Sequence, residues 1–437
     1  MKRSILRIIL IKPSMGPIIE GYSINDGRME PLSLGIIAAL TPADIEVSLY
    51  DDRMEAIPFE QPADLVAISV DTFTAARAYQ ISARFRERGV PVILGGIHVT
   101  LLPDEAASHA DSIFTGDAEH GWGEVIADLR QGRLKPRYTS GFGVPQQDII
   151  PRRELFKGKG YLPISLVQFS RGCQYNCSYC AVSRYFQQTH YCRSSRAVIH
   201  EIEAGGLKQI LFVDDNMVCN RQHLKEFLKE LIPLKIKWAS QASIDMVRDP
   251  ELMELMAASG CVGNLIGFEA ISPDNLKWFN KSPNLQQFDT YQKALEVLRD
   301  YGFQTWASFI LGNDFDTPET VKQTVKFAIE NKFALAFFHI FSPYPGTALY
   351  RQLETEQRLL LDGKWWLHGD YRYNQAAFIP RHFTPEELSR EVVQANKEFF
   401  TWNSIMKRAL DRKTNLRSLQ KFLIYAQFNL IMRKTST

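Results

Sequence analysis

Residues 170–180 read SRGCQYNCSYC and directly follow the apolar run Ile164 to Phe169. This stretch places Cys173, Cys177 and Cys180 in one loop, and no fourth cysteine stands at a matched spacing. Three thiolates leave one iron of a 4Fe–4S cluster open to an exogenous ligand, whereas a fourth fixed ligand would close the site. We therefore predict that Cys173, Cys177 and Cys180 are the metal ligands of a catalytic iron–sulfur cluster.

A structural zinc ion is the other occupant that these cysteines allow, with Cys192 or His190 as the closing ligand. Structural zinc sites usually pair two cysteine knuckles at a fixed separation, and no second knuckle follows here. The spacing therefore favours the cluster. Cys192, Cys219 and Cys261 have no ligand spacing and are expected to be structural.

The composition is that of an ordinary globular protein of 437 residues, with 45% apolar and 23% charged residues. The 51 Lys and Arg against 49 Asp and Glu give a net charge of +2, so no overall field favours nucleic acid, and no nucleic-acid partner is expected. All six cysteines lie between Cys173 and Cys261, which indicates metal chemistry in a reducing compartment, the cytoplasm. The run Ile5–Ile11 is too short for a signal peptide, and no stretch reaches membrane-spanning length.

Residues 1–135 alternate short apolar runs with helix-like segments, which is typical of an α/β fold with a doubly wound, five-strand parallel sheet of the flavodoxin-like type. The expected strands are Leu6–Ile11, Val47–Tyr50, Leu65–Ser69, Val92–Leu94 and Ser112–Phe114. Ligands bind such sheets at the carboxyl ends of the strands. Three loops at that edge carry small or polar residues, and their candidate ligand contacts are Ser69, Thr72, Gly95, Gly96, Ile97, His98, Gly116 and Glu119.

Residues 136–160 are rich in glycine, proline and charge and are predicted to be a linker. From 161 to 355 the alternation resumes over six units, which predicts a partial β/α barrel with its active face at the strand carboxyl ends. Residues 356–437 are expected to form a C-terminal extension, with an aromatic loop around Trp365 and Trp366 and then helices. The expected barrel strands are Ile164–Phe169, Gln209–Val213, Ile236–Ser240, Asn264–Glu269, Gln304–Ile310 and Ala334–Ile340.

The last part of this extension is basic. Between Lys407 and Lys434 it holds eight Lys or Arg and only Asp411 as an acid, interleaved with apolar residues. Such a tail can make a peripheral contact with an anionic membrane surface, or it can pack back on the barrel as a helix. The packed helix is the favoured interpretation.

The motif RGCxxxCxYC at the start of a six-unit β/α array resembles the radical S-adenosylmethionine (SAM) superfamily over residues 164–350. The resemblance implies a 4Fe–4S cluster on the three cysteines and SAM on the fourth iron, where an electron from the cluster yields a 5′-deoxyadenosyl radical. It also implies that polar residues at the strand ends contact SAM, although helix capping explains any single one equally well. These residues are Tyr179, Asp214, Asn216, Gln241, Ser243, Glu269 and Ser308.

Residues 30–130 resemble the cobalamin-binding domains of one radical SAM subgroup, which includes hopanoid methylases and the anaerobic magnesium-protoporphyrin ester cyclase. Cobalamin domains that give a histidine to cobalt carry Asp-x-His-x-x-Gly, whereas the corresponding stretch here reads Asp51-Asp52-Arg53-Met54-Glu55. The resemblance implies either corrin binding without a protein imidazole, which is favoured, or a vestigial domain that binds no corrin. His98 is the nearest imidazole on the expected binding edge and is not assigned to cobalt.

The subgroup implies an enzyme that functionalises an unactivated carbon of an extended, apolar small molecule, with methyl transfer favoured and a flavodoxin or ferredoxin as electron donor. An oxidative cyclase or hydroxylase acting on a tetrapyrrole or lipid-like substrate is the first alternative. A non-enzymatic cobalamin or iron–sulfur sensor and a zinc protein that binds nucleic acid are the others, and neither explains polar residues at the strand ends of a six-unit array. Methylthiotransferases are excluded, because residues 1–172 hold no cysteine for their second cluster.

Overall fold

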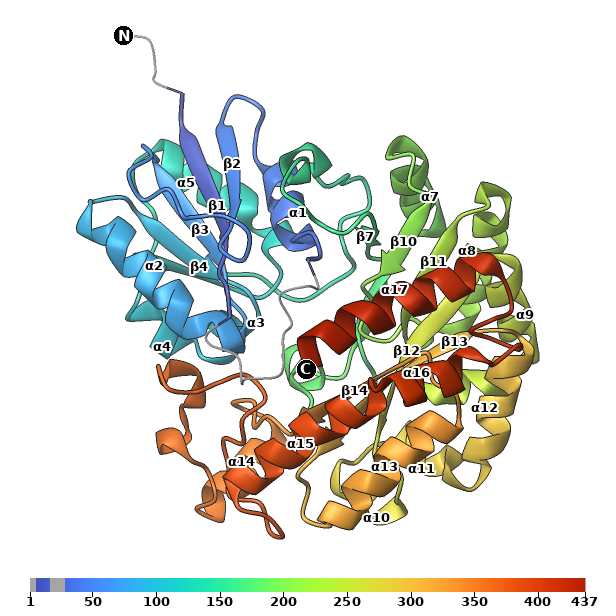
Figure 1. The fold of residues 1–437 in the computed structure, drawn as a ribbon. Helices are drawn as coiled ribbons and strands as arrows, with labels where there is room; N and C mark the ends of the chain where they lie inside the picture. The colour runs from blue at the N-terminus through green and yellow to red at the C-terminus, as the bar shows by residue number, and fades with distance from the viewer. Residues whose placement is uncertain (1–4, 16–27, 437) are drawn as a thin grey trace. The chain divides into compact units, whose positions relative to one another are not determined.

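The computed structural model describes residues 5–15 and 28–436. The described chain divides into two compact units, which Figure 1 draws as ribbons. The N-terminal unit takes in the chain up to Pro163 and, from much later in the sequence, Lys364–Tyr373. The barrel unit takes in Ile164–Gly363 and the chain from Asn374 onward.

The N-terminal unit is built on a fully parallel sheet with the strand order β2-β1-β3-β4-β5-β6. Its first five strands confirm the predicted ones, and the order 2-1-3-4-5 is that of flavodoxin-like folds. The apolar residues of β1 are buried in its middle, as expected for a central parallel strand. The strands are β1 (Arg7–Lys12), β2 (Glu46–Asp51), β3 (Leu65–Ser69), β4 (Val92–Gly95), β5 (Ser112–Thr115) and β6 (Arg137–Thr139), and the longer helices are α1 (Leu32–Leu40), α2 (Ala75–Glu87) and α5 (Trp122–Arg130).

The sixth strand, β6, lies inside the segment that was predicted to be a linker. Its three residues alternate exposed, buried and exposed, with Tyr138 facing the core, and so short a run leaves no clear signal in the sequence. Further along the same segment, Phe156 packs into the core of the N-terminal unit. Gly35 leaves room for this ring, because a Cβ there would lie 2.7 Å from Phe156 Cζ. Residues 136–160 therefore belong to the packed N-terminal unit.

The barrel unit is built on a second parallel sheet with the order β14-β13-β12-β11-β10-β7, so each strand pairs with its neighbours in the chain. All six predicted strands are present. Helices that follow them include α7 (Ser195–Ala204), α8 (Arg221–Leu231), α9 (Pro250–Ala258), α12 (Tyr291–Asp300), α13 (Pro318–Glu330) and α14 (Ala348–Thr355). The strands are β7 (Ser165–Val167), β10 (Gln209–Phe212), β11 (Lys237–Ala242), β12 (Cys261–Glu269), β13 (Gln304–Leu311) and β14 (Leu335–Ile340).

The C-terminal helices α15 (Pro385–Phe399), α16 (Trp402–Ala409) and α17 (Leu419–Ser436) pack against the barrel unit. Asn396 on α15 donates to the Phe338 carbonyl of β14 at 2.9 Å, and Asn429 on α17 donates to the Ala334 carbonyl at 3.0 Å. The favoured interpretation of the basic tail as helices packed on the barrel agrees with these contacts. In the part of the chain that the structure describes, no helix combines the length and the apolar character needed to cross a bilayer.

Arg408 is the buried centre of this C-terminal layer. Its guanidinium donates to the carbonyls of Phe333 and Ala334, both at 3.0 Å, to that of Phe399 at 2.9 Å, and to Asn429 Oδ1 at 2.9 Å. It also lies 3.8 Å from the centroid of the Phe399 ring, and burial lowers the pKa of Arg408 to about 10. One side chain thus joins the start of β14 to α15 and α17.

Replacing this residue by Arg408→Met is expected to lower the free energy of unfolding by roughly 3 kcal/mol, because several buried carbonyls lose their donor at once. Urea denaturation followed by circular dichroism measures the change. Arg412→Met is the matched control, since Arg412 is exposed. A loss below about 1 kcal/mol in Arg408→Met, which is the range of ordinary surface pairs, would show that the layer does not depend on this guanidinium.

Candidate active site

The cysteine loop lies between the two strands of a short hairpin and is hydrogen-bonded to two other segments of the barrel unit. The hairpin strands β8 (Ser170–Gly172) and β9 (His190–Cys192) pair antiparallel and were not predicted, since each has only three residues. Within the loop, the amide of Ser178 donates to the Phe279 carbonyl at 3.0 Å, and its own carbonyl accepts from the Leu349 amide at 3.0 Å. The backbone between Cys177 and Cys180 is therefore held in place from both sides.

Two carboxylates after β10 fix the entry to this loop. Asp214 is fully buried and accepts from the amide and hydroxyl of Ser170 and from the Phe169 amide, and Asp215 accepts from the Gly172 amide at 2.8 Å. Burial raises the pKa of Asp214 to about 7. Gly172 has φ +82°, and a Cβ there would overlap the Thr189 carbonyl oxygen. These contacts account for Asp214 as a loop anchor, and its predicted contact with SAM stays a prediction.

The surroundings of the three loop cysteines shift their pKa values in different directions. A hydrogen bond with Cys219, whose sulfur lies 4.0 Å from Cys173 Sγ, lowers the pKa of Cys173 to about 7. Burial raises the pKa of Cys177 to about 12 and also raises the pKa of Cys180. Nearby thiolate charge contributes to the raised pKa values of both. An iron–sulfur cluster binds cysteines as thiolates, so its positive irons would offset the burial that opposes ionisation of Cys177 and Cys180.

The described residues contain no set of side chains that could ligate a single metal ion. Across residues 5–15 and 28–436, no three His, Cys, Asp or Glu side chains form a group that could hold one ion. The cysteine ligands of a cubane cluster sit on different irons, so their sulfurs are spaced more widely than the ligands of one ion. The assignment of Cys173, Cys177 and Cys180 as cluster ligands therefore stays a prediction.

Glu269 ends strand β12 in an unusual backbone conformation. Its φ is +61°, and the pairing with β13 shifts register between Gly267 and Glu269. The buried carboxylate accepts from Tyr179 Oη at 2.9 Å and from Lys281 Nζ at 2.7 Å. A Cβ on Gly267 would overlap this carboxylate. A non-glycine residue held at positive φ beside a bulge is a feature that concentrates at functional sites.

Other predicted strand-end residues are also brought together. Asn216 Nδ2 donates to Ser243 Oγ at 3.2 Å, the Ser243 amide donates to Asn216 Oδ1 at 3.2 Å, and the same Nδ2 lies 3.9 Å from Cys173 Sγ. Gln241 lies on β11 with its side chain exposed, and Ser308 lies half-buried on β13 opposite Gly267. The structure thus places Asn216 and Ser243 beside a predicted cluster ligand, while contacts of all these residues with SAM stay predictions.

Lys281 and Cys219 belong to this region and were missed as site residues. Lys281 follows α10 (Pro273–Trp278) in a loop between helices, where no strand end marks a position as part of the active face. Cys219 has no ligand spacing, and only its contact with Cys173 brings it to the site. No sequence signal could have found either one.

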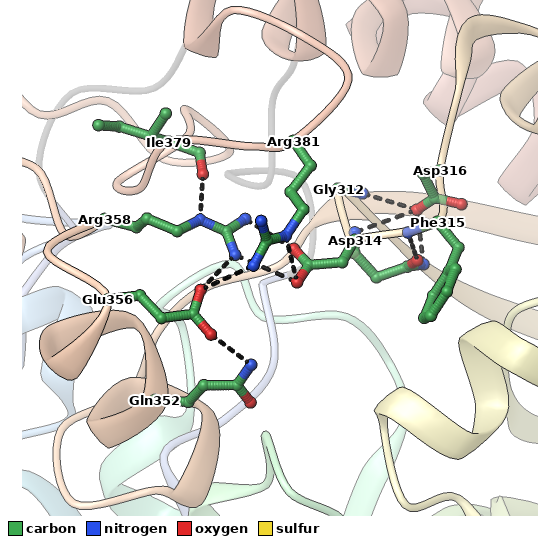
Figure 2. Close-up of polar contacts among 10 residues, drawn as sticks. Gly312, Asp314, Phe315, Asp316, Gln352, Glu356, Arg358, Ile379 and Arg381 are labelled. Carbon is green, nitrogen blue, oxygen red and sulfur yellow. Dashed lines mark hydrogen bonds and ion pairs between the residues drawn. The ribbon is translucent and has the colours of Figure 1, made fainter.

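The loop after β13 is fixed by carboxylates, as Figure 2 shows. Asp316 accepts from the amides of Gly312 at 2.8 Å and Asn313 at 3.2 Å. Asp314 accepts from Arg358 at 2.6 Å and from Arg381 at 2.9 Å, and both arginines also contact Glu356. This network ties the carboxyl end of β13 to the end of α14 and to the segment around residue 380.

At the predicted cobalamin edge of the N-terminal unit, His98 is wholly buried. Its Nε2 lies 3.1 Å from Tyr79 Oη and 3.2 Å from Glu105 Oε1, and its Nδ1 lies 3.3 Å from Thr72 Oγ1. Trp366, from the later segment of this unit, donates to the same Glu105 oxygen at 2.9 Å. Both imidazole nitrogens therefore have protein partners, which agrees with leaving His98 unassigned to cobalt.

The glycines of this edge have structural reasons for being glycine. Gly96 has φ +108°, and a Cβ there would lie 2.6 Å from the Val70 carbonyl oxygen. Gly116 has φ +85°, and a Cβ there would overlap the Ser140 carbonyl oxygen. Ser69, Gly95, Ile97 and Glu119 are half-buried, and Glu119 accepts from the Gln146 amide at 2.7 Å. Contacts of these residues with a corrin stay predictions.

Comparison with known proteins assigns the barrel. The family profile described as "Radical SAM superfamily" matches residues 167–328, which run from the last residue of β7 into α13. The chain is a radical SAM enzyme. In such an enzyme the cofactors are a 4Fe–4S cluster and SAM, and the assignment of the cluster to the cysteine triplet stays a prediction.

The relatives of this radical SAM enzyme extend over both units. The bacteriochlorophyllide d C-8(2)-methyltransferase of Chlorobaculum tepidum is 29% identical, over 88% of this chain and 89% of its own. The hopanoid C-2 methylase of Rhodopseudomonas palustris is 26% identical, over 86% and 74%. The anaerobic magnesium-protoporphyrin IX monomethyl ester cyclase of Rubrivivax gelatinosus is 26% identical, over 66% and 57%.

A solved structure shares the fold. The radical S-adenosylmethionine methyltransferase TsrM from Kitasatospora setae, in complex with tryptophan and a SAM analogue, superposes with a TM-score of 0.62 over 80% of this chain and 76% of its own, at 19% identity. A second TsrM structure, with cobalamin and a [4Fe-4S] cluster bound, gives 0.61 at 18% identity. Both of the parallel sheets described above fall within the α/β architecture of this fold.

Proposed function

We propose that this radical SAM enzyme uses cobalamin to transfer a methyl group to an unactivated carbon of an extended, apolar small molecule. The single observation that carries the proposal is the contact between the cysteine loop and the carboxyl end of β12. Tyr179, which lies in the loop of Cys173, Cys177 and Cys180, donates to Glu269 there. The relatives that extend over most of the chain and are named methyltransferases or methylases support methyl transfer over other outcomes.

Different residues of the barrel unit would bind the cluster and SAM. Cys173, Cys177 and Cys180 would hold the cluster, and Glu269 would accept hydrogen bonds from SAM, with Tyr179 beside it. Asn216, Gln241, Ser243 and Ser308 supply amide and hydroxyl groups of the kind that bind ribose, ammonium and carboxylate groups. When bound, the reduced cluster supplies the electron that generates the 5′-deoxyadenosyl radical from SAM, and cobalamin supplies the methyl group.

Cobalamin would bind the carboxyl edge of the N-terminal sheet without a histidine ligand. Arg53 stands where cobalamin domains with an Asp-x-His motif have histidine, and its guanidinium is held by Asp51 at 2.9 and 2.6 Å. His98 is engaged by Tyr79, Glu105 and Thr72. The flavodoxin-like strand order and the fold shared with a cobalamin-bound methyltransferase support this part of the proposal.

Anaerobic reconstitution with iron, sulfide and hydroxocobalamin tests the proposal. The reconstituted enzyme, reduced and supplied with SAM and with a tetrapyrrole or a hopanoid as probe, is analysed by mass spectrometry. We expect both 5′-deoxyadenosine and S-adenosylhomocysteine, because methyl transfer consumes SAM in two ways. If protein with a complete cluster forms neither 5′-deoxyadenosine nor S-adenosylhomocysteine, the proposal is contradicted.

An oxidative cyclase or hydroxylase is the second candidate, supported by the similarity to the magnesium-protoporphyrin ester cyclases. The chain spans 57% of the length of one such cyclase and 55% of another, against 89% of the bacteriochlorophyllide methyltransferase. In the same experiment this candidate predicts 5′-deoxyadenosine without S-adenosylhomocysteine. A flavodoxin or ferredoxin is proposed as electron donor for either reaction, and reduction of the cluster by flavodoxin and its reductase in place of dithionite tests it.

We also propose that α16 and α17 rest on an anionic membrane surface, from which an apolar substrate would be taken. Trp402, Met406 and Leu410 follow one another at four-residue steps and are 53%, 57% and 70% exposed. Leu419 and Leu423 begin a second stripe and are 74% and 56% exposed. Apolar stripes beside lysine and arginine are the pattern of helices that lie in a lipid interface.

The double substitution Leu419→Glu and Leu423→Glu is expected to lower binding to phosphatidylglycerol vesicles at least tenfold. It replaces apolar side chains that would enter the lipid by negative charges, which anionic lipid repels. Co-sedimentation with vesicles measures the binding. Val144→Glu is the matched control, since Val144 is 46% exposed in the N-terminal unit. Equal sedimentation of the double variant and the wild type, or none of the wild type, would refute the membrane contact.

A further inference from the structure

A buried ammonium group lies at the cysteine loop. The side chain of Lys281 is 15% exposed, and its Nζ donates to Glu269 Oε1 at 2.7 Å and to Tyr179 Oη at 3.2 Å. It also lies 5.9 Å from the centroid of the Tyr179 ring, and Tyr179 stands in the loop directly before Cys180. A charge taken out of water is costly unless it is paired, so this lysine needs its carboxylate partner.

The ammonium of Lys281 is held at the loop that carries the cysteines. Its partner Tyr179 lies between Cys177 and Cys180 in the sequence, and the Tyr179 hydroxyl also donates to Glu269 Oε1 at 2.9 Å. A Cβ on Gly267 would lie 2.9 Å from Lys281 Nζ, so the glycine leaves room for the ammonium. Lys281 therefore places a buried positive charge on the segment between two of the predicted cluster ligands.

We propose that Lys281 is a positioning residue that holds Glu269 in place for SAM and sets one positive charge beside the cluster, where it favours the reduced state. The proposal rests on the cluster ligation given under Proposed function. Reduction adds one electron, and a fixed positive charge in a low-dielectric site stabilises that added negative charge. Cluster potentials are set in part by such nearby charge.

The competing role for Lys281 is a purely structural counter-ion of Glu269. The two roles predict different results. A structural counter-ion changes the stability of the fold when it is removed, but it leaves the potential of a cluster that still assembles unchanged. A residue that tunes the cluster changes the potential, and a second cation at the same position restores it.

The test compares the full chain with the variants Lys281→Met, Lys281→Arg and Lys277→Met, each reconstituted anaerobically and titrated with redox mediators while the reduced cluster is followed by electron paramagnetic resonance. We expect Lys281→Met to lower the ratio of reduced to oxidised cluster about tenfold at a fixed potential, which is about 59 mV for one electron. Lys281→Arg keeps the charge and should restore most of this ratio. Lys277→Met should match the wild type, because Lys277 is 62% exposed and paired with Asp274 on the surface of α10.

Each other outcome has a defined meaning. Failure of Lys281→Met to assemble a cluster, with normal iron content in Lys281→Arg, supports the need for the charge. A fully loaded Lys281→Met with an unchanged potential overturns the proposal, and so does loss of the cluster in both Lys281 variants. If the wild type itself holds no cluster, the proposed function fails together with this inference, which separates that result from a failure of Lys281 alone.

Discussion

Cys177→Ala is expected to abolish the brown colour of the reconstituted protein and to reduce its iron and sulfide content to background. Cys177 is the buried member of the triplet, and the backbone of its neighbour Ser178 is bonded to Phe279 and Leu349, which fixes the position of Cys177 in the loop. With two thiolates in place of three, one more iron of the cluster has no protein ligand. Iron and sulfide analysis with the absorption spectrum measures the loss.

Cys261→Ala is the matched control for this experiment. Cys261 is also buried, but it begins β12, at the end of the strand opposite to Glu269, and its thiol contacts Gly263 and Asn264. This variant should bind the same iron as the wild type. Full iron content in Cys177→Ala, or equal losses in the two variants, would remove Cys177 from the set of ligands.

Glu269→Gln is expected to weaken SAM binding roughly thirtyfold, which corresponds to about 2 kcal/mol for a lost hydrogen bond to a charged group. The amide has nearly the same size, so the bulge at Gly267 and the contact with Tyr179 can remain. The cysteines are untouched, and the glutamine oxygen can still accept from Lys281 Nζ in place of the carboxylate. Equilibrium dialysis of reconstituted protein with labelled SAM measures the affinity.

Iron content separates this prediction from a general loss of structure. Glu269→Gln should retain the wild-type iron content while it loses SAM, whereas a misfolded variant would lose both. Glu251→Gln is the control, because Glu251 is exposed and forms only surface ion pairs with Lys225 and Lys229. Unchanged SAM affinity in loaded Glu269→Gln would show that the carboxylate serves only the Lys281 pair.

The repeating units of the fold could be predicted from the sequence, because each strand of a buried parallel sheet is a continuous apolar run. All six strands of the barrel and five of the N-terminal sheet were found in this way. Strand β6 and the β8–β9 hairpin were missed, since three residues carry too little pattern. Lys364–Tyr373 joins the N-terminal unit through contacts such as Trp366 with Glu105, and no local pattern encodes a partner so distant in the chain.

The candidate site could be predicted only as far as strand ends and cysteine spacing reach. Spacing gave the triplet, and strand ends gave Glu269, Asn216 and Ser243. Burial and partners cannot be read from the sequence, so the engagement of Asp214 with the backbone of Ser170 appears only in the structure. Lys281 shows the same limit more clearly, because its importance comes from two residues that lie 12 and 102 positions away in the chain.

The account depends on an iron that stays open for SAM in a cluster held by three cysteines. Electron paramagnetic resonance of the dithionite-reduced wild type, recorded with and without SAM, tests this most directly. We predict that SAM shifts the g values of the reduced cluster, because its amino and carboxylate groups bind the open iron, and that the Cys177→Ala protein gives no such signal. A cluster spectrum that is identical with and without saturating SAM would contradict the account.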